Sequence, residues 1–240
     1  YRRHGFIIAL DDFGIGYSNM DRIALLKPNI VKLDSSLIKD IHHCLHKQEI
    51  IKSITGLSRK IGAVVVAKGI ENRLEALKSL ELRTDFLQGE FFQYDLIDSS
   101  NPLEYKIKNL HTDFKCQIML NLEIRQNRIT FLQNKMQLFK SILNSASDCE
   151  EALFKIVYSN SFVESAYILD INGKQVSSTV ISPFAKHGQN MTLFSPALKH
   201  SDHSLKIYYY KIKTGESEFH ISDPYISHAP GHRCMTISSI

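Results

Sequence analysis

Hydrophobic runs alternate with helically spaced segments over the amino-terminal part of the chain. The first run, GFIIALDD (5–12), is apolar up to its two final acids, which is the pattern of a strand buried on both faces of a parallel sheet. The runs are GFIIALDD (5–12), NIVKLD (29–34), AVVVAKGI (63–70) and TDFLQGEFF (84–92). Between them, 18–28 has helical spacing and ends at Pro28, 35–61 has room for a helix or two before Gly62, and 72–82 predicts a further helix. This alternation predicts an α/β fold with parallel strands and helical crossovers, either an open sheet or a (β/α)8 barrel.

Polar residues stand at or near the carboxyl ends of these predicted strands. They are Asp11, Asp12, Lys32, Asp34, Lys68 and Gln88. The carboxyl ends of parallel strands meet at one edge of a sheet, where α/β folds bind ligands. One such aspartate alone is usually a helix cap or a turn former. The repeated placement on four strands favours a common site instead.

The pattern changes after residue 100. From 101 to 144 there is no glycine and one proline, Pro102, and apolar residues recur at intervals of three, four or seven. This predicts a long helix that packs either on the domains of its own chain or in a coiled coil with a second copy.

Shorter elements follow the long helix. CEEALFKIVYSN (149–160) has helical spacing, and residues 165–179 predict a hairpin with Asn172 and Gly173 at its turn. Aromatic-rich strands are predicted within 205–227 and another strand within 232–240. A helix followed by meandering strands indicates an α+β domain.

Composition excludes several classes of protein. The chain has 240 residues, 43% hydrophobic and 22% charged, and its net charge of +4 lacks a basic block that would indicate nucleic-acid binding. No apolar run reaches the roughly 20 residues of a membrane span. Four widely spaced cysteines suit free thiols in a reducing compartment. The 11 histidines are irregularly spaced and are expected on the surface rather than in a metal site. We therefore expect a cytoplasmic protein.

Four motifs carry a resemblance to a known family. DDFGIGYSN (11–19), VKLD (31–34), VVVAKGIE (64–71) and DFLQGEFF (85–92) together resemble the second half of the EAL domain of cyclic di-GMP phosphodiesterases. The resemblance covers residues 1–97. It implies a partial (β/α)8 EAL barrel and hydrolysis of one phosphodiester bond of cyclic di-GMP, assisted by Mg²⁺ or Mn²⁺.

The resemblance also implies residue roles. Asp11 resembles a metal ligand that bridges two ions, and Asp12 resembles a ligand of the second ion. Lys32 resembles the lysine that contacts the attacking water or the phosphate. Asp34, the second candidate catalytic residue, supports the site. Gln88 resembles a substrate-binding glutamine at the cavity floor. The loop DDFGIGYS resembles one that couples the site to the interface of a homodimer.

Lys68 departs from the family pattern, which has a metal-binding glutamate at this position. An ammonium group cannot coordinate a metal ion and repels it, so we expect a catalytically impaired EAL homologue that regulates or binds cyclic di-GMP. Alternatively, Lys68 replaces the missing cation and pairs with a substrate phosphate or with Asp11 and Asp12. Two other readings stay open, an active metal-dependent phosphodiesterase and a non-catalytic dimer scaffold.

A second departure concerns the EAL tripeptide itself, which does not occur upstream of the DDFG motif. The tripeptides at Glu75 and Glu151 lie inside predicted amphipathic helices, whereas a catalytic motif would end an early strand. We reject both as catalytic, and expect the chain to be part of a longer protein or the product of a truncated gene.

The carboxyl-terminal segment SDPYISHAPGHRCMTISSI (222–240) resembles Cache-like sensor domains, relatives of PAS folds. The implied organisation is a helical linker at 98–147 and a PAS/Cache-like domain at 148–240, incomplete at its end, as in YkuI-type proteins. Such a domain holds a small carboxylate, amine or amino-acid-like ligand, or is a packed scaffold without one. The candidate pocket residues are Tyr167, Asp170, Asp223, Tyr225 and Arg233.

Overall fold

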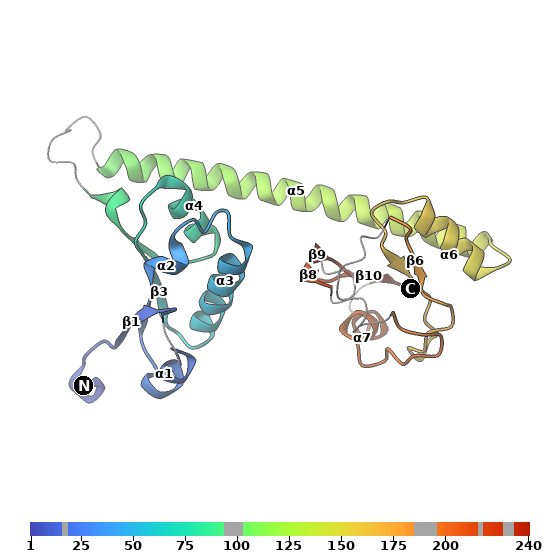
Figure 1. The fold of residues 1–240 in the computed structure, drawn as a ribbon, viewed down its shortest axis with the longest axis horizontal. Helices are drawn as coiled ribbons and strands as arrows, with labels where there is room; N and C mark the ends of the chain where they lie inside the picture. The colour runs from blue at the N-terminus through green and yellow to red at the C-terminus, as the bar shows by residue number, and fades with distance from the viewer. Residues whose placement is uncertain (16–18, 94–102, 185–195, 216–217, 228–232) are drawn as a thin grey trace. The chain divides into compact units, whose positions relative to one another are not determined.

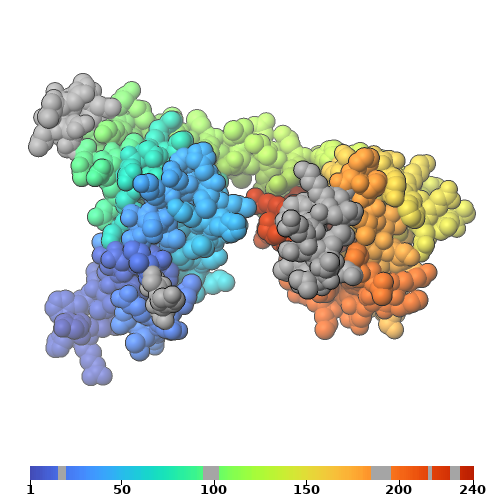
Figure 2. Space-filling model, in the orientation of Figure 1, coloured from blue at the N-terminus to red at the C-terminus, as the bar shows by residue number. Residues whose placement is uncertain are grey.

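A computed structural model of the chain describes residues 1–15, 19–93, 103–184, 196–215, 218–227 and 233–240 (Figures 1 and 2). The chain forms two compact units, Tyr1–Arg125 and Gln126–Ile240. Helix α5 (Leu103–Ser145) contributes residues to both units, at the place where the apolar spacing predicts a long helix. No helix among the described residues is long and apolar enough to cross a membrane.

The first unit is built on a four-stranded parallel sheet. Its strands are β1 (Ala9–Phe13), β2 (Ile30–Leu33), β3 (Val64–Lys68) and β4 (Phe86–Gln88), in that spatial order. The helices are α1 (Asn19–Leu26), α2 (Ser35–Ile38), α3 (Leu45–Lys60) and α4 (Arg73–Glu81), with 3-10 turns η1 (Arg2–His4) and η2 (Glu90–Phe92). The predicted alternation of parallel strands and helices is confirmed, and the second half of the predicted strand 84–92 is the turn η2.

The two faces of this sheet differ in burial. Residues of one face, such as Val31, Leu33 and Val65, are buried in the core, and α3 lies alongside the sheet (Figure 1). Fully burying an aliphatic side chain of this size stabilises the fold by about 1.5–3 kcal/mol. Because side chains alternate along a strand, the opposite face carries Lys32 and Lys68, which are only partly buried.

The amino-terminal part of α5 packs on the first unit. Leu110 and Phe114 join its hydrophobic core. The Asp113 carboxylate accepts a hydrogen bond of 2.7 Å from Nε of Arg73, the first residue of α4. The Gln117 amide donates to Glu81 at the other end of α4. Helix α4 is therefore held along its length by this part of α5.

The second unit combines helices with short antiparallel strand pairs. After α6 (Cys149–Tyr158), the pairs are β5 (Ser165–Ala166) with β6 (Val180–Ile181), β7 (Phe219–Ile221) with β10 (Ile237–Ser239), and β8 (Tyr225–Ile226) with β9 (Arg233–Cys234). Helix α7 (Ile207–Lys213) precedes β7. Leu153, Val157 and Val180 form a small core.

Of two sequence predictions for this unit, the structure confirms one and contradicts the other. The hairpin over 165–179 is confirmed, with a turn closed by the bond from Gly173 N to Asp170 O and with Gly173 in the left-handed region at φ 82°. The strand predicted at the start of 205–227 is wrong, because residues 207–213 form α7. Its aromatic side chains make tertiary contacts that override their strand preference.

Candidate functional site

The two aspartates of β1 share a local irregularity of the sheet. Leu10 pairs with Val31 and Phe13 with Leu33, so Asp11 and Asp12 together stand opposite the single residue Lys32. This is a bulge, and Asp12 adopts a left-handed backbone conformation with φ 53°. In a regular strand consecutive side chains point to opposite faces. The bulge lets both carboxylates reach the same cation.

That cation is the ammonium group of Lys68. Its Nζ lies 2.9 Å from Oδ1 of Asp11 and 2.6 Å from Oδ1 of Asp12. The Lys32 ammonium lies 3.5 Å from the other Asp11 oxygen, Oδ2. The Lys68 side chain is only 23% exposed, so it turns toward the carboxylates and not into solvent. The structure therefore brings together Asp11, Asp12, Lys32 and Lys68, as their placement at or near the carboxyl ends of the strands predicts.

The pKa shifts follow these contacts. The hydrogen bond from Lys68, followed by the bond from the Asp12 amide, lowers the pKa of Asp11, and the charge of Lys32 acts in the same direction. The bonds to Asp12 and Asp11 raise the pKa of Lys68 above its ordinary value of 10.5. Lys68 is therefore a permanent ammonium group at neutral pH, and Asp11 a permanent carboxylate.

Asp34 caps the amino-terminal end of helix α2. It is buried at the N-cap of α2, where Oδ1 accepts a hydrogen bond of 2.8 Å from the Ser36 amide. Its bonds with Ser36 lower its pKa, and the charge of Lys68 contributes in the same direction. A side chain on Gly69, just after Lys68, would collide with Ser35. The Lys68 strand end is thus packed closely against the Asp34 cap.

Gln88 ends β4 in register with Lys68, so the two residues are neighbours on the sheet. The following turn is fixed by backbone contacts: Ile70 N donates to Gln88 O at 3.1 Å, and Phe91 N donates to Ile70 O at 3.0 Å. A Cβ atom on Gly89 would overlap the backbone of Ile70. The ends of β3 and β4 are therefore locked together, with Gln88 beside Lys68.

The residues present do not fit a two-metal site. Divalent ions such as Mg²⁺ need carboxylate oxygens, and here Lys68 already engages one oxygen of each aspartate. Among the residues that the structure describes, no group of three His, Cys, Asp or Glu side chains is placed to hold a metal ion. Glu71 lies beyond the strand end, and its amide donates to Glu75.

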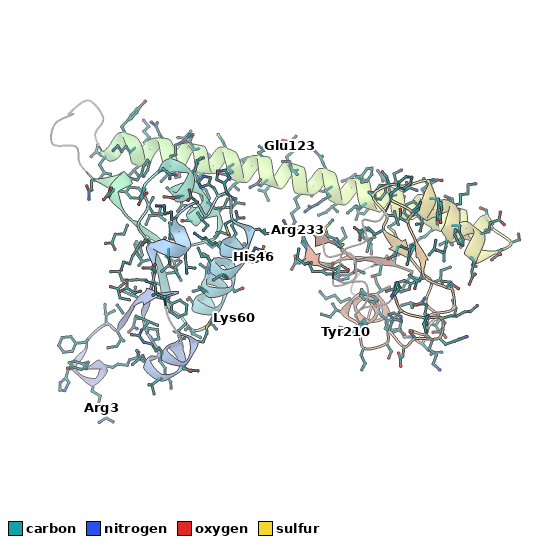
Figure 3. The ribbon with its side chains drawn as sticks, in the orientation of Figure 1. Arg3, His46, Lys60, Glu123, Tyr210 and Arg233 are labelled. Atoms are coloured by element: carbon teal, nitrogen blue, oxygen red, sulfur yellow. The ribbon has the colours of Figure 1, made fainter. Side chains whose placement is uncertain are left out.

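The predicted pocket residues of the second unit occupy several elements. Tyr167 donates to the Tyr208 hydroxyl at 3.0 Å, and Tyr225 on β8 bonds to Thr236 at 2.8 Å. The Asp170 carboxylate accepts bonds from the amides of its own turn. Arg233 is an exposed residue of β9 (Figure 3). Asp223 lies between β7 and β8.

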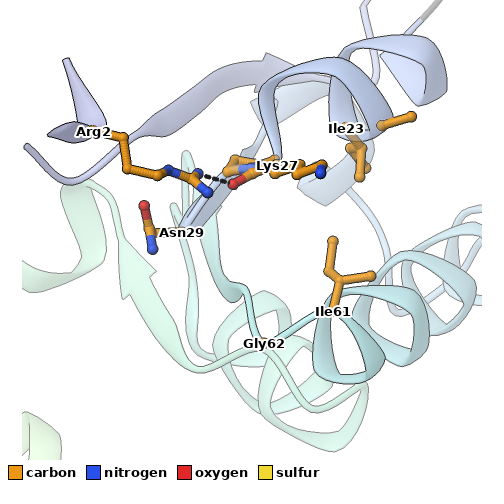
Figure 4. Close-up of a pocket in the computed structure, with 8 residues that line it drawn as sticks. Arg2, Ile23, Lys27, Asn29, Ile61 and Gly62 are labelled. Carbon is orange, nitrogen blue, oxygen red and sulfur yellow. Dashed lines mark hydrogen bonds between the residues drawn. The ribbon is translucent and has the colours of Figure 1, made fainter.

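A shallow pocket lies at the amino-terminal ends of the strands, away from the aspartates. In Figure 4, Ile23 and Ile61 form its apolar wall, and the Arg2 guanidinium reaches the carbonyl oxygen of Lys27. Arg2 also donates to the Leu26 carbonyl, so it provides hydrogen bonds to carbonyl oxygens at the carboxyl end of α1. This arrangement is structural and leaves the strand-end cluster as the candidate site.

Sequence reasoning missed His203 and Tyr208. The expectation of surface histidines is wrong for His203, which is 6% exposed and bonds to Tyr208 Oη and Gln175 Oε1. The sequence signal was weak, because His203 stands in a polar stretch and Tyr208 within a run of three tyrosines.

Known proteins resemble this chain most clearly in its first part. Residues 1–94 match the EAL domain. The probable cyclic di-GMP phosphodiesterase PdeA of Escherichia coli K12 is 37% identical over 87 residues, covering 36% of this chain and 12% of PdeA. The uncharacterized EAL-domain containing protein YkuI of Bacillus subtilis 168 is 41% identical over 71 residues, covering 30% of this chain and 17% of YkuI.

One solved structure resembles the fold of this chain beyond residues 1–94. The crystal structure of Bacillus subtilis YkuI, with an EAL domain and in complex with its substrate cyclic di-GMP and calcium, has a TM-score of 0.76 at 23% identity. The match covers 100% of this chain and 60% of that chain. The chain thus spans only part of its relatives' length. The family likeness of the chain is thus a match of residues 1–94 to the EAL domain, and its relatives over this part include the cyclic di-GMP phosphodiesterase PdeF of Escherichia coli K12, which is 34% identical over 102 residues.

Proposed function

We propose that this chain is a cyclic di-GMP signalling protein whose EAL segment is catalytically impaired and acts as a nucleotide-binding regulatory module. The observation that carries the proposal is the Lys68 ammonium, within 2.9 Å of Asp11 and 2.6 Å of Asp12. We take the identity of the nucleotide from relatives that are named as cyclic di-GMP phosphodiesterases.

The charges of the cluster explain the impairment. Asp11 and Asp12 contribute −2 and Lys32 and Lys68 contribute +2, so the four groups already balance without a metal ion. Metal-assisted phosphodiester hydrolysis relies on a bound ion to activate water and to clamp the phosphate. In this site Lys68 is fixed where it repels such an ion. The Lys68 and Lys32 ammonium groups can instead pair with phosphate oxygens, with the Gln88 amide beside them as a further contact.

The finer organisation belongs to the same proposal. We take residues 1–97 as a partial (β/α)8 EAL barrel, 98–147 as the linker and 148–240 as a PAS/Cache-like domain for a small ligand. The likeness of fold to YkuI over the whole chain supports this division. We also propose a cytoplasmic homodimer, in which the sensor domain regulates the EAL segment.

The first test measures turnover and binding on the full chain. Native protein and the variant Lys68→Glu are assayed for hydrolysis of cyclic di-GMP with Mg²⁺ or Mn²⁺, and calorimetry measures binding of the nucleotide and of Mn²⁺ alone. We expect native protein to bind the nucleotide without turnover, and Lys68→Glu to gain both Mn²⁺ binding and hydrolysis. Lys60→Glu makes the same charge change at the exposed end of α3 (Figure 3) and should gain neither.

The outcomes separate the alternatives. Hydrolysis by native protein at about 1 per second or faster, a rate typical of enzymes, would refute impairment and support an active Mg²⁺- or Mn²⁺-dependent phosphodiesterase. No cyclic di-GMP binding, with or without metal, would support a non-catalytic dimer scaffold. Nucleotide binding that survives a chelator but weakens in Lys68→Gln would support a role for Lys68 in holding the phosphate.

A further inference from the structure

The second unit contains a chain of four hydrogen-bonded polar side chains. Tyr167 Oη lies 3.0 Å from Tyr208 Oη, which lies 2.6 Å from Nδ1 of His203. His203 Nε2 in turn lies 3.1 Å from Oε1 of Gln175. Gln175 is fully buried and His203 nearly so. Tyr208 comes from α7, whose side chains are drawn in Figure 3.

The orientation of the Gln175 amide is fixed by its other neighbours. Its Nε2 donates to the Ser177 carbonyl at 2.9 Å and to Thr179 Oγ1 at 2.9 Å. Thr179 donates its own hydroxyl proton to the Ala197 carbonyl at 2.7 Å, so its oxygen is an acceptor toward Gln175. The nitrogen of the amide must therefore face these groups, and Oε1 must face His203.

This orientation determines where the protons of His203 lie. A carbonyl oxygen only accepts, so His203 Nε2 carries a proton and donates it to Gln175. Neutral imidazole then has a bare Nδ1, which accepts the hydroxyl proton of Tyr208. Tyr208 Oη accepts in turn from Tyr167. Every proton in the chain of bonds has one assigned direction when His203 is neutral.

Protonation of His203 would break this order. Imidazolium carries a proton on Nδ1 as well, and this proton meets the hydroxyl proton of Tyr208. Tyr208 must then turn its proton toward Tyr167, and the Tyr167 hydroxyl loses its acceptor. One added proton therefore reverses two hydrogen bonds and places a charge in a site that is 6% exposed.

The charged groups around His203 come from its own loop and from the hairpin that carries Gln175. Lys206 opposes protonation and Asp202 favours it, with Lys174 close to Asp202. The ring of Tyr167 lies 5.1 Å from the imidazole ring, centroid to centroid. Burial is the largest cause that lowers the pKa of His203 below its ordinary 6.5, followed by the charge of Lys206.

We propose that His203 is a proton-sensing site of the carboxyl-terminal unit, in which protonation reverses the Gln175–His203–Tyr208–Tyr167 hydrogen-bond chain. Because the folded state disfavours the charged form of His203, the stabilisation that neutral His203 gives is present above the pKa of this residue in the unfolded chain. It is lost as the pH falls from there through the lower pKa of the folded state. Acidification thus loosens this unit through one residue.

The test uses the full chain with ¹⁵N-labelled histidine. Two-bond ¹H–¹⁵N correlation spectra distinguish the two neutral tautomers, and a pH titration gives the pKa, with His203→Gln used to assign the signals. We expect the Nε2-protonated tautomer and a pKa below 6.5. An Nδ1-protonated tautomer, or a pKa at or above 6.5, would overturn the proposal. This measurement on native protein decides the matter even if His203→Gln does not fold, because signals can then be assigned from other histidine variants.

A matched pair of lysine variants tests the surroundings. Lys206→Gln removes the exposed charge that opposes protonation, so the His203 pKa should rise. Lys211→Gln makes the same change further along α7 and should leave that pKa in place. Equal shifts in both variants would show a general charge effect and would contradict the assigned role of the loop.

Discussion

The buried carboxylate of Glu75 offers a direct test of how the candidate site is held. Glu75 is 1% exposed in the first turn of α4. Its Oε1 accepts a hydrogen bond of 3.0 Å from the Asp40 amide, and its Oε2 accepts one of 3.0 Å from the Glu71 amide. One side chain thus ties the segment after α2 to the loop that follows Lys68. We predict that Glu75→Ala loosens both segments.

The magnitude follows from the two bonds. A hydrogen bond to a charged acceptor contributes about 1.5–3 kcal/mol, and a buried donor left unpaired costs about 1–3 kcal/mol. Loss of both bonds in Glu75→Ala should therefore cost about 3–6 kcal/mol, a large share of the roughly 5–15 kcal/mol that stabilises a domain. Glu75→Gln keeps one acceptor oxygen and should lose about half as much.

Amide hydrogen exchange is the suitable assay, because a chain of two units need not unfold in a single step. Exchange of the Asp40 and Glu71 amides should accelerate in Glu75→Ala and less in Glu75→Gln. Glu49→Gln, an exposed glutamate on α3, is the matched control and should change local stability by less than about 0.5 kcal/mol. If Glu75→Ala changed exchange no more than this control, the carboxylate would not hold the two segments.

Two further predictions concern the same strand ends. Gly89→Ala should prevent the first unit from folding stably, because the new Cβ overlaps the Ile70 backbone; circular dichroism and solubility would show the loss, and native-like unfolding would contradict the close packing. Asp34→Ala should cost about 0.5–2 kcal/mol through loss of the α2 cap. Since the folded pKa of Asp34 lies below 3.8, its stabilisation is present above that value and is lost as the pH falls through the folded pKa. An acid titration of stability should therefore be shallower in Asp34→Asn, and an unchanged profile would exclude this role.

The sheet could be predicted from the sequence because burial and periodicity agree there. Val31, Leu33 and Val65 are apolar, β-branched or large, and lie in runs too short for a helix and flanked by turn residues. The parallel order then follows from the helical segments between the runs. The same reasoning placed the polar strand ends at one edge of the sheet, and the structure brings Asp11, Lys32 and Lys68 into contact there.

Helix α7 shows where this reasoning fails. The tyrosines and isoleucines of residues 207–213 favour strands when considered alone. In the structure Tyr208 bonds to His203, Tyr209 donates to the Ile171 carbonyl, and Ile212 is buried. The partner of Tyr209, Ile171, is distant in the sequence, so the local pattern of residues 207–213 could not reveal this contact. A local signal existed in Gly215, which has φ 72° just after the helix, as glycines at helix ends often do.

The bulge in β1 is the feature of the site that periodicity could not supply, and it decides what the substitution at Lys68 means. Without it, Asp11 and Asp12 would point to opposite faces, and Lys68 could reach only one of them. With it, one ammonium group contacts both carboxylates. The position of Lys68 therefore controls the charge of the whole cluster. Glutamate there would change the sum over Asp11, Asp12, Lys32 and residue 68 from zero to −2, which attracts a divalent cation. On the same backbone, the side chain at position 68 thus decides whether this cluster is neutral or carries a net charge of −2.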